Sequence, residues 1–354
     1  MSTSPLRKTR SARRGLGRAT LADVARAAGV TAITVSRYLR EPQRVSLQTA
    51  QRIAQALSAT GYVPNKQAGA LASAGSGASR MVAALIPNIA NSIFAETVQG
   101  LADALQGSGC ELLLGSTDYS VEREEAQLRA LMGWFPSAIV VTGRRHTDAA
   151  RALLQQARAR GTPVIEIWDQ HAASDGFTQI GFDHAAVGRA MAAHLIERGH
   201  HRLAYLDSGV AEDFRAHERG EGFLAQARHQ RVAARRLAAP RTGDAMQSGR
   251  EALALLLDAA GRPAFGAVAC ANDHLACGVL LGAQAVGLVV PREIALLGFG
   301  DFAFGRQLEP ALSTVQVPRH EIGQAAGRAL LAALDGQTVA DQRLPWTLLP
   351  RSST

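Results

Sequence analysis

The sequence is poor in cysteine and has no long apolar run, and each scarcity excludes a class of protein. Its three cysteines, Cys110, Cys270 and Cys277, are too few for a disulfide framework and lack the spacing of a zinc site. No stretch approaches the roughly 18–20 unbroken apolar residues that a membrane span needs. The basic N-terminus runs into polar and glycine residues instead of an apolar segment with a cleavage site, so no secretory signal is evident. We expect a cytoplasmic protein in a reducing compartment, with no membrane partner.

Motifs of catalysis are missing as well. The sequence has no GxxxxGK[ST] loop, no GxSxG elbow, no HExxH and no GxGxxG after a strand. The pair His200 and His201 lies between Gly199 and an apolar run, which favours surface residues over a site. We therefore expect no catalytic residues, no bound metal and no cofactor. An enzyme with an appended binding head is the alternative class.

Positive charge is concentrated at one end of the chain. The net charge is +8, yet residues 1–72 hold twelve Lys and Arg against only Asp23 and Glu41, which leaves the rest slightly negative. A small basic head on a near-neutral body is the electrostatic footprint of a polyanion-binding module. Residues 1–19 carry six basic residues, no acidic ones and little hydrophobicity, so we expect a disordered basic tail there.

Residues 20–64 show three short helical patterns. Thr20 can cap the first helix in a capping box with Asp23, Gly29 supplies a tight turn, and Thr31 caps the second helix. Ser46 is expected to cap the third helix, which ends at Gly61 and turns four residues inward: Ala50, Ile53, Ala54 and Leu57.

The remainder of the chain has a different pattern of apolar and polar residues. Residues 65–79 are interpreted as a hinge segment and a flexible linker. From residue 80 to 354, apolar strand-like runs alternate with alanine-rich helical stretches, which predicts parallel sheets covered by helices on both faces. About 275 residues exceed one typical sheet domain, so we expect two lobes with a cleft between them. One lobe would hold about 80–180 and 313–341, the other about 181–312 and 342–354.

The head carries a helix-turn-helix pattern. Thr20–Leu39 reads TLADVARAAGVTAITVSRYL, and in such a motif the second helix enters the DNA major groove by its N-terminal part. With Val35 and Leu39 packed inward, the opposite face holds Ala32, Ile33, Ser36 and Arg37. The hydroxyls of Thr20 and Thr31 stand at helix N-termini, where phosphate oxygens can bind. An ordinary helical hairpin, with Ile33 in its core, is the alternative.

The same stretch resembles the lactose/galactose repressor (LacI/GalR) family. The likeness rests on the helix-turn-helix, RVS at Arg44–Ser46, GYVPN at Gly61–Asn65 and the pair Leu71–Ala72, and it extends over nearly the whole chain after residue 19. Within the family, IPNIANSIFAETVQG and CANDHLACG look most like gluconate repressors. The resemblance implies an all-α DNA-binding domain joined to a two-lobed α/β effector domain of the periplasmic-binding-protein type. It also implies a homodimer on a pseudo-palindromic double-stranded DNA operator.

The resemblance assigns roles to residues of the head and hinge. Base contacts would come from Ala32, Ile33, Ser36 and Arg37, and backbone contacts from Thr20, Thr31, Thr34 and Arg44. The segment from Asn65 and Lys66 matches the family's hinge helix, whose Leu71 would wedge into the minor groove. Nine residues with Gly69 inside are too few for a stable isolated helix, so we expect this segment to order only on DNA. A non-specific nucleoid-associated protein is a third class.

Polar and aromatic residues follow the predicted strands of the body, where open parallel sheets place ligands. These are Asn91, Phe94, Trp168, Asp169, Asn272 and Asp301. By position in family motifs, Phe94, Arg219, Asn272 and Asp301 match effector contacts, and either Trp168 or Asp169 matches a further one. Asp273 as a helix cap and Asp301 as a turn former are the structural alternatives.

A pair of arginines points to the chemistry of the ligand. Arg215 and Arg219 are spaced i,i+4, so on a helix both project from one face and can bind a carboxylate. We hypothesise a sugar-acid effector, gluconate or a keto-gluconate, that releases the repressor from its operator. The alternatives are that Arg215 pairs with Glu212 or Glu218, that the ligand is a neutral sugar or a purine, and that it acts as a corepressor.

Overall fold

A computed structural model describes residues 19–62, 81–89, 92–171 and 176–354. The chain divides into two compact units, residues 1–78 and 79–354, and each is described by itself. Four of the expected site residues, Asn65, Lys66, Leu71 and Asn91, lie outside the described residues, as does the basic tail up to residue 18. None of the helices in the described ranges has the length and apolar character that a membrane crossing requires.

The first unit is a three-helix structure with a small apolar core. It consists of α1 (Leu21–Ala28), α2 (Ala32–Arg40), the 3-10 turn η1 (Pro42–Arg44) and α3 (Leu47–Thr60). The predicted capping box is confirmed: Asp23 N donates to Thr20 Oγ1 at 3.3 Å and Thr20 N donates to Asp23 Oδ2 at 2.9 Å. Gly29 ends α1 at φ 61°, a left-handed conformation that favours glycine. The buried core residues are Val24, Ala25, Ala28, Val35, Ile53 and Ala56.

The third helix differs from its prediction at two places. Ile53 and Ala56 are buried, whereas Ala54, expected inward, is exposed. The buried face of α3 is therefore narrower than predicted, because Ile53 and Ala56, at positions i and i+3, already fill the small core. Ser46 occupies the N-cap position, but its hydroxyl donates to Thr49 Oγ1 at 2.9 Å and makes no cap to the backbone.

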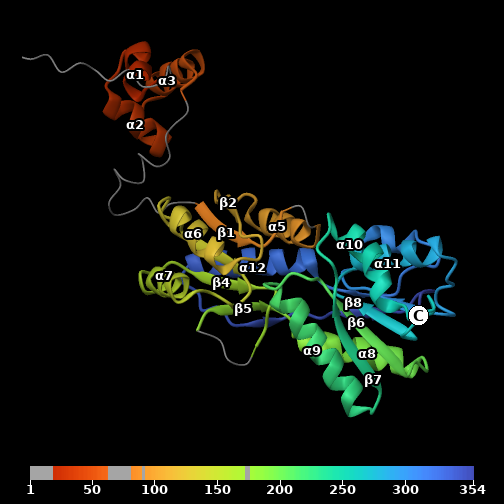
Figure 1. Cartoon of the computed structure of the whole chain (residues 1–354). Coiled ribbons are helices and arrows are strands. Elements are labelled where there is room, and N and C mark those ends of the chain that lie inside the picture. The colour runs from red at the N-terminus through yellow and green to blue at the C-terminus, as the bar shows by residue number, and fades with distance from the viewer. Residues whose placement is uncertain (1–18, 63–80, 90–91, 172–175) are drawn as a thin grey trace, which may run out of the picture. The chain divides into compact units, whose positions relative to one another are not determined.

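The first lobe of the second unit is built on a six-stranded parallel sheet. The strand order is β11-β5-β4-β3-β1-β2. Figure 1 labels four of these strands, β1, β2, β4 and β5. The strands are β1 (Met81–Ile86), β2 (Glu111–Ser116), β3 (Ala138–Thr142), β4 (Val164–Ile167), β5 (Thr178–Gly181) and β11 (Gln342–Arg343). One face packs on α5 (Ser92–Leu105) and α12 (Arg319–Leu334), and the other on α6 (Val121–Met132) and α7 (Asp148–Ala159). The sheet is thus covered on both faces, as parallel sheets require.

The second lobe is built on a four-stranded parallel sheet of order β7-β6-β8-β9. The strands are β6 (Arg202–Asp207), β7 (Ala233–Ala238), β8 (Ala267–Cys270) and β9 (Ala295–Leu297). The helices are α8 (His184–Glu197), α9 (Phe214–His229), α10 (Ala245–Leu256) and α11 (Asp273–Ala285), and η2 (Ala303–Arg306) is a 3-10 turn. An antiparallel ribbon of β10 (Thr314–Gln316) and β12 (Thr347–Leu349) joins this lobe through the bridge between Leu297 and Ser313. The predicted α/β fold with parallel sheets is confirmed.

The chain passes three times between the lobes, after β5, after β10 and after β11. Because β11 pairs with β5, residues 342–343 belong to the first sheet. The last crossing therefore follows Arg343, slightly later in the chain than the sequence predicts. These three connecting segments form the hinge between the lobes. They lie beside the carboxyl ends of the strands of the first sheet, which is where open parallel sheets bind ligands.

Helices α8 and α9 approach each other without intervening side chains. A methyl group at Gly188 would lie 1.8 Å from Arg219 O, and one at Gly222 would lie 2.1 Å from Ala185 O. Both positions therefore admit only glycine, and the two backbones are in direct contact. This contact fixes the position of α9, which carries the two arginines singled out above.

Candidate functional site

The outward face of α2 is the first candidate site. Ala32 and Arg37 are exposed and Ile33 is 70 % exposed, while Val35 is fully buried. Ile33 therefore does not belong to the core of this unit, contrary to the hairpin interpretation, which placed Ile33 in the core. An exposed apolar side chain beside an exposed arginine suits the major groove, where thymine offers a methyl group and guanine two acceptors.

The threonines of this unit already serve as helix caps. Thr31 Oγ1 accepts from Thr34 N at 3.2 Å and lies 2.9 Å from Thr34 Oγ1. A phosphate at these helix starts would thus meet the remaining backbone N–H groups as well as the hydroxyls. Arg44 Nε pairs with Glu41 at 2.5 Å, but both side chains are largely exposed. Such a surface pair is weak and can be exchanged for a phosphate.

The second candidate site is a cluster of buried aromatic rings between the two lobes. The ring of Trp168 lies 5.4 Å from that of Phe94 on α5 and 5.9 Å from that of Phe182, which follows β5. Phe299, which follows β9, lies 6.4 Å from Phe182. All four side chains are buried. The first lobe, the hinge and the second lobe each contribute to this cluster.

Arg215 and Arg219 reach the cluster from α9, and both are only 4 % exposed. The Cζ atom of Arg219 lies 3.9 Å from the centre of the Phe299 ring, and Nη2 donates to Ala271 O at 2.9 Å. The Cζ atom of Arg215 lies 5.7 Å from the centre of the Phe94 ring, and Nη1 donates to Thr142 O at 3.5 Å. The i,i+4 spacing thus places both guanidiniums against the aromatic cluster.

His184 bonds to Arg219 but does not neutralise it. Its Nε2 donates to Trp168 O at 2.9 Å, so its Nδ1 accepts from Arg219 Nη1 at 3.0 Å. Burial, together with Arg219 and Arg215, lowers the pKa of His184 well below its usual value. The ring is therefore neutral at physiological pH.

Asp169 is a buried carboxyl group close to Arg215. A methyl group at Gly143 would lie 2.7 Å from Arg215 Nη1 and 3.1 Å from Asp169 Oδ2, so both side chains approach Gly143. Asp169 is 2 % exposed and its Oδ2 is buried without a hydrogen-bond partner. Burial raises the pKa of Asp169 to about 7, against the lowering influence of Arg215. At neutral pH this group supplies only part of a countercharge.

The two arginines have no other acidic partner in the described part of the chain. Glu218 pairs with Arg144 and not with Arg215, and no ion pair joins Arg215 to Glu212. The alternative interpretation of Arg215 is therefore excluded for the described residues. Arg219 Nε is also buried with no hydrogen-bond partner. Two buried guanidiniums with so little charge compensation can donate hydrogen bonds to an anionic ligand and be neutralised by its charge.

A cavity of about 570 Å³ opens beside Arg215. It lies at the carboxyl ends of β1, β2 and β3 and at the start of α9, and it does not extend to Phe94, Trp168, Arg219 or Asn272. A second cavity of about 480 Å³ lies at the hinge and includes Asp169, Phe182 and His184. Arg144 borders both cavities. Their size is typical of small-molecule sites.

His146 forms a buried charged cluster in the wall of the larger cavity. Its Nδ1 lies 2.5 Å from Glu124 Oε1 and its Nε2 lies 3.4 Å from Glu166 Oε1. Burial alone would lower the pKa of His146, but the hydrogen bonds and charges of Glu124 and Glu166 outweigh burial and raise it to about 9. This histidine is a cation with its anions already in place.

Asn272 and Asp273 have separate roles at the start of α11. Asn272 Oδ1 accepts from Leu275 N at 2.9 Å, so Asn272 is the helix cap, and Arg219 binds the carbonyl of the preceding residue. Asp273 is fully buried and accepts from Thr314 Oγ1 at 2.6 Å and from Phe302 N at 2.9 Å. Asn272 thus stays beside the arginines, while Asp273 ties α11 to β10 rather than capping it.

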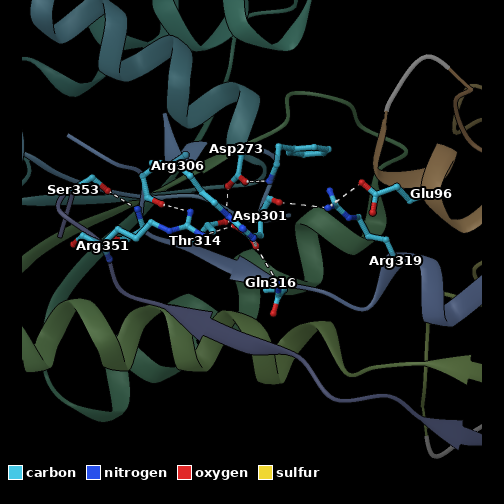
Figure 2. A network of polar contacts seen from close by, with 12 residues as sticks. Glu96, Asp273, Asp301, Arg306, Thr314, Gln316, Arg319, Arg351 and Ser353 are labelled. Carbon is cyan, nitrogen blue, oxygen red and sulfur yellow. Dashed lines mark hydrogen bonds and ion pairs between the residues drawn. The ribbon is translucent and has the colours of Figure 1, made fainter. Parts of the chain in front are cut away.

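Asp301 belongs to a different network, shown in Figure 2. Its two carboxylate oxygens accept from Arg306 and Arg351, and Gln316 Nε2 donates to Oδ2 at 3.1 Å. The residue has a left-handed φ of 53°. Both oxygens are therefore used inside the protein, and Asp301 shapes its own turn. A contact between Asp301 and the effector stays a prediction, and the effector would share the carboxylate with these arginines.

Several residues of the cleft are missing from the sequence-based expectation. Phe182 and His184 follow β5, Phe299 follows β9, and Arg144 and His146 follow β3. The rule that selected Trp168 and Asp169, a polar or aromatic residue just past a strand, would have found them. In the described ranges no group of three metal-ligating side chains is close enough to hold a metal ion.

The chain matches two known families along most of its length. Residues 20–65 match the family described as "Bacterial regulatory proteins, lacI family". Residues 192–354 match the family described as "Periplasmic binding protein-like domain". The first match covers the helical unit. The second match begins within α8 and covers the remainder of the second lobe, together with α12 and β11 of the first lobe.

Individual relatives are similar over almost the entire chain. The HTH-type transcriptional regulator GntR of Pseudomonas aeruginosa is 37% identical over 96% of this chain and 97% of its own length. The regulator of the same name from Escherichia coli K12 is 33% identical over 95% of this chain and 98% of its own length. The crystal structure of a LacI family transcriptional regulator from Silicibacter pomeroyi has a TM-score of 0.85 and 33% identity, covering 95% of this chain and 99% of that one.

Proposed function

The chain belongs to the LacI family of bacterial regulatory proteins, and from this premise we propose that a sugar acid releases it from a pseudo-palindromic operator. It is a LacI-type transcriptional repressor rather than an enzyme. Repressors of this family bind DNA operators and sugar effectors, usually as dimers. The operator symmetry, the effector and the contact residues of this chain are the proposed part.

On the DNA side, α2 enters the major groove. Ala32, Ile33, Ser36 and Arg37 read base edges, and the starts of α1 and α2 with Thr34 and Arg44 hold the phosphate backbone. The exposure of Ile33 and Arg37 opposite the buried Val35 supports this assignment. A homodimer presents two such helices to a symmetric site, with Asn65, Lys66 and Leu71 of the hinge at its centre.

On the ligand side, one observation carries the proposal: Arg215 and Arg219 are both 4 % exposed without an ion-pair partner among the described residues. An uncompensated buried guanidinium is unfavourable, so the arrangement persists because a ligand anion completes it. Arginine binds a carboxylate through two parallel hydrogen bonds. The carboxylate of gluconate or a keto-gluconate supplies this anion, with Phe94, Trp168, Asp169 and Asn272 around the remainder of the sugar acid.

Ligand binding between the lobes changes DNA affinity through the three chain segments that connect the lobes. The ligand bonds to Arg215 and Arg219 on the second lobe and to Asp169 on the first, so it favours one relative position of the lobes. To shift the protein from almost fully bound to almost fully released, the ligand must favour the released state by about 5 kcal/mol. A ligand that instead stabilises the DNA-bound state would be a corepressor.

The DNA proposal is tested by footprinting the full chain on the DNA upstream of its own gene. We expect a protected site with two-fold symmetry. Arg37→Ala should weaken binding to that site by about 1–3 kcal/mol, whereas Arg228→Ala, at an exposed arginine of the second unit, should not. Equal affinity for the symmetric site and random duplex would contradict the proposal.

The ligand proposal is tested by calorimetric titration with gluconate, 2-ketogluconate, galactose and a purine. We expect binding of the acids only, and release of the footprinted site by the acid that binds most tightly. Arg219→Gln should reduce that affinity by about 100-fold, because the ligand carboxylate loses a charge-assisted pair. Binding confined to neutral ligands would refute the sugar-acid assignment and leave the DNA assignment standing.

A further inference from the structure

Two arginines share one aromatic ring at the larger cavity. The Cζ atom of Arg145 lies 5.0 Å from the centre of the Phe214 ring, and the Cζ atom of Arg215 lies 4.9 Å from the same centre. The two guanidiniums are therefore no more than 9.9 Å apart, the sum of these distances. Arg215 is buried and Arg145 is exposed, so one stands at the inner end of the cavity and the other at its opening.

The lining of this cavity is strongly positive. Four arginines and His146 face it, against Glu124 and Glu212. Glu124 is already paired with His146, which leaves Glu212 as the one lining carboxylate of the cavity without an ion pair among the described residues. A cavity lined by charge of one sign concentrates ligands of the opposite sign. Arg144 pairs with Glu218, and no ion pair of Arg145 is found among the described residues. One monoanionic carboxylate at Arg215 would therefore leave the charge of Arg145 without an anion.

Arg144, beside Arg145, already holds a carboxylate. Its guanidinium pairs with Glu218 of α9, and each of the two side chains is 25% exposed. Arg144 belongs to the first lobe and lines both cavities, whereas Glu218 comes from the second lobe and lines only the cavity at the hinge. The loop after β3 thus presents an anion-binding guanidinium toward the second lobe, and the protein's own carboxylate shows that an anion fits there.

We propose that the larger cavity binds a sugar acid with an anion at each end: the carboxylate at Arg215, and a phosphate or second carboxylate at Arg144 and Arg145. This inference rests on the proposed function, because it takes the sugar-acid cleft as given. Chain geometry allows roughly 1.2 Å of reach per bond, so the terminal carbons of a six-carbon acid lie about 6 Å apart. Guanidiniums within 9.9 Å of each other can contact both ends of such a molecule. Planar guanidinium suits phosphate and carboxylate alike.

Calorimetric titration of the full chain with three acids tests this inference. The probes are gluconate with one anion, glucarate with a carboxylate at each end, and gluconate 6-phosphate. We expect the two doubly charged acids to bind at least about tenfold more tightly than gluconate, which corresponds to one additional charge-assisted contact. Comparison of glucarate with gluconate 6-phosphate identifies which second anion the arginines prefer.

Variants separate the second anion's contacts from general electrostatic attraction. Arg145→Gln and Arg144→Gln should bring the affinity ratio of doubly to singly charged acid close to one. Glu218→Gln should raise this ratio, because it frees Arg144 and removes a nearby negative charge. Arg228→Gln removes the same charge from an exposed position at the far end of α9 and should leave the ratio unchanged.

The outcomes distinguish this inference from the proposed function. If gluconate binds as tightly as both doubly charged acids, or if the ratio survives Arg145→Gln, the second anion site is refuted and the sugar-acid effector stands. If none of the three acids binds, the proposed effector class is itself wrong.

Discussion

Two clusters of the second unit contain buried charged side chains that include arginines, but the two clusters differ in how the charges are compensated. Around Asp301, a buried carboxylate is held by Arg306 and Arg351, so the charges are satisfied within the protein. Around the aromatic rings, Arg215 and Arg219 are as deeply buried as Asp301 but have no ion-pair partner in the described residues. A charge cluster that is satisfied within the protein stabilises the fold, whereas an unsatisfied one can be completed by a ligand. Charge compensation, and not burial, distinguishes the Asp301 cluster from the proposed binding cluster.

The largest effect is expected where the satisfied cluster loses its shared anion. Asp301→Asn keeps the shape of the side chain but leaves Arg351, whose side chain is 16% exposed, without its countercharge. The free energy of unfolding of the second unit should fall by about 3 kcal/mol, as measured by urea denaturation. Asp335→Asn, at an exposed helix end, is the matched control and should change it by less than about 0.5 kcal/mol. An equally small change at Asp301 would remove the contrast between the clusters.

The unsatisfied cluster should respond in the opposite way. Arg215→Met removes a buried cation whose hydrogen bond to Thr142 O is 3.5 Å long. The free energy of unfolding should stay within about 1 kcal/mol of the parent value or increase, while the affinity for the sugar acid falls by about 2.7 kcal/mol. Paired denaturation and calorimetry measure both quantities. Arg228→Met, on the exposed end of the same helix, serves as control; loss of stability without loss of affinity at Arg215 would reverse the assignment.

His146 is a satisfied cation and should make stability depend on pH. Its folded-state pKa of about 9 lies above the ordinary value of 6.5. The stabilisation is therefore complete below pH 6.5 and is lost as the pH rises toward 9, by about 2 kcal/mol after allowance for screening. Denaturation at several pH values in this window should show the decline. His146→Gln should flatten it, and exposed His229→Gln should not; an unchanged decline in His146→Gln would mean that other groups titrate.

The smallest effect is expected at the exposed edge of the satisfied cluster. The side chain of Arg306 is 56% exposed, and Arg351 still neutralises Asp301 when Arg306 is removed. Arg306→Ala should therefore cost less than about 1 kcal/mol of unfolding free energy in the same urea assay. A loss as large as that of Asp301→Asn would show that both arginines are needed.

Local sequence patterns predict the fold and the exposed face of α2 well. The capping box of Thr20 and Asp23, the turn at Gly29 and the outward direction of Ile33 follow from spacing within a few residues. Ala54 was predicted to point inward but is exposed. The prediction failed because the width of a buried helix face depends on how much core the other helices supply.

Charge compensation cannot be predicted from neighbouring residues. Asp301 and Asp169 both follow strands, but Asp301 is neutralised by Arg351, fifty residues further along the chain, and Asp169 has no such partner. Likewise, Glu218 is three residues from Arg215, yet it pairs with Arg144 of the other lobe. Only the folded arrangement shows which arginine remains for a ligand.

Because α8 and α9 are in backbone contact, binding of the proposed ligand should depend on Gly188, a residue with no side chain to contact the ligand. Because Gly188 abuts the carbonyl of Arg219, a single added carbon there would push the whole of α9 away from α8. Both guanidiniums would move with their helix, which would change their positions relative to the rings of Phe94 and Phe299. Random mutagenesis screened for loss of induction should therefore return changes at residue 188, on a helix that provides no cation to the ligand.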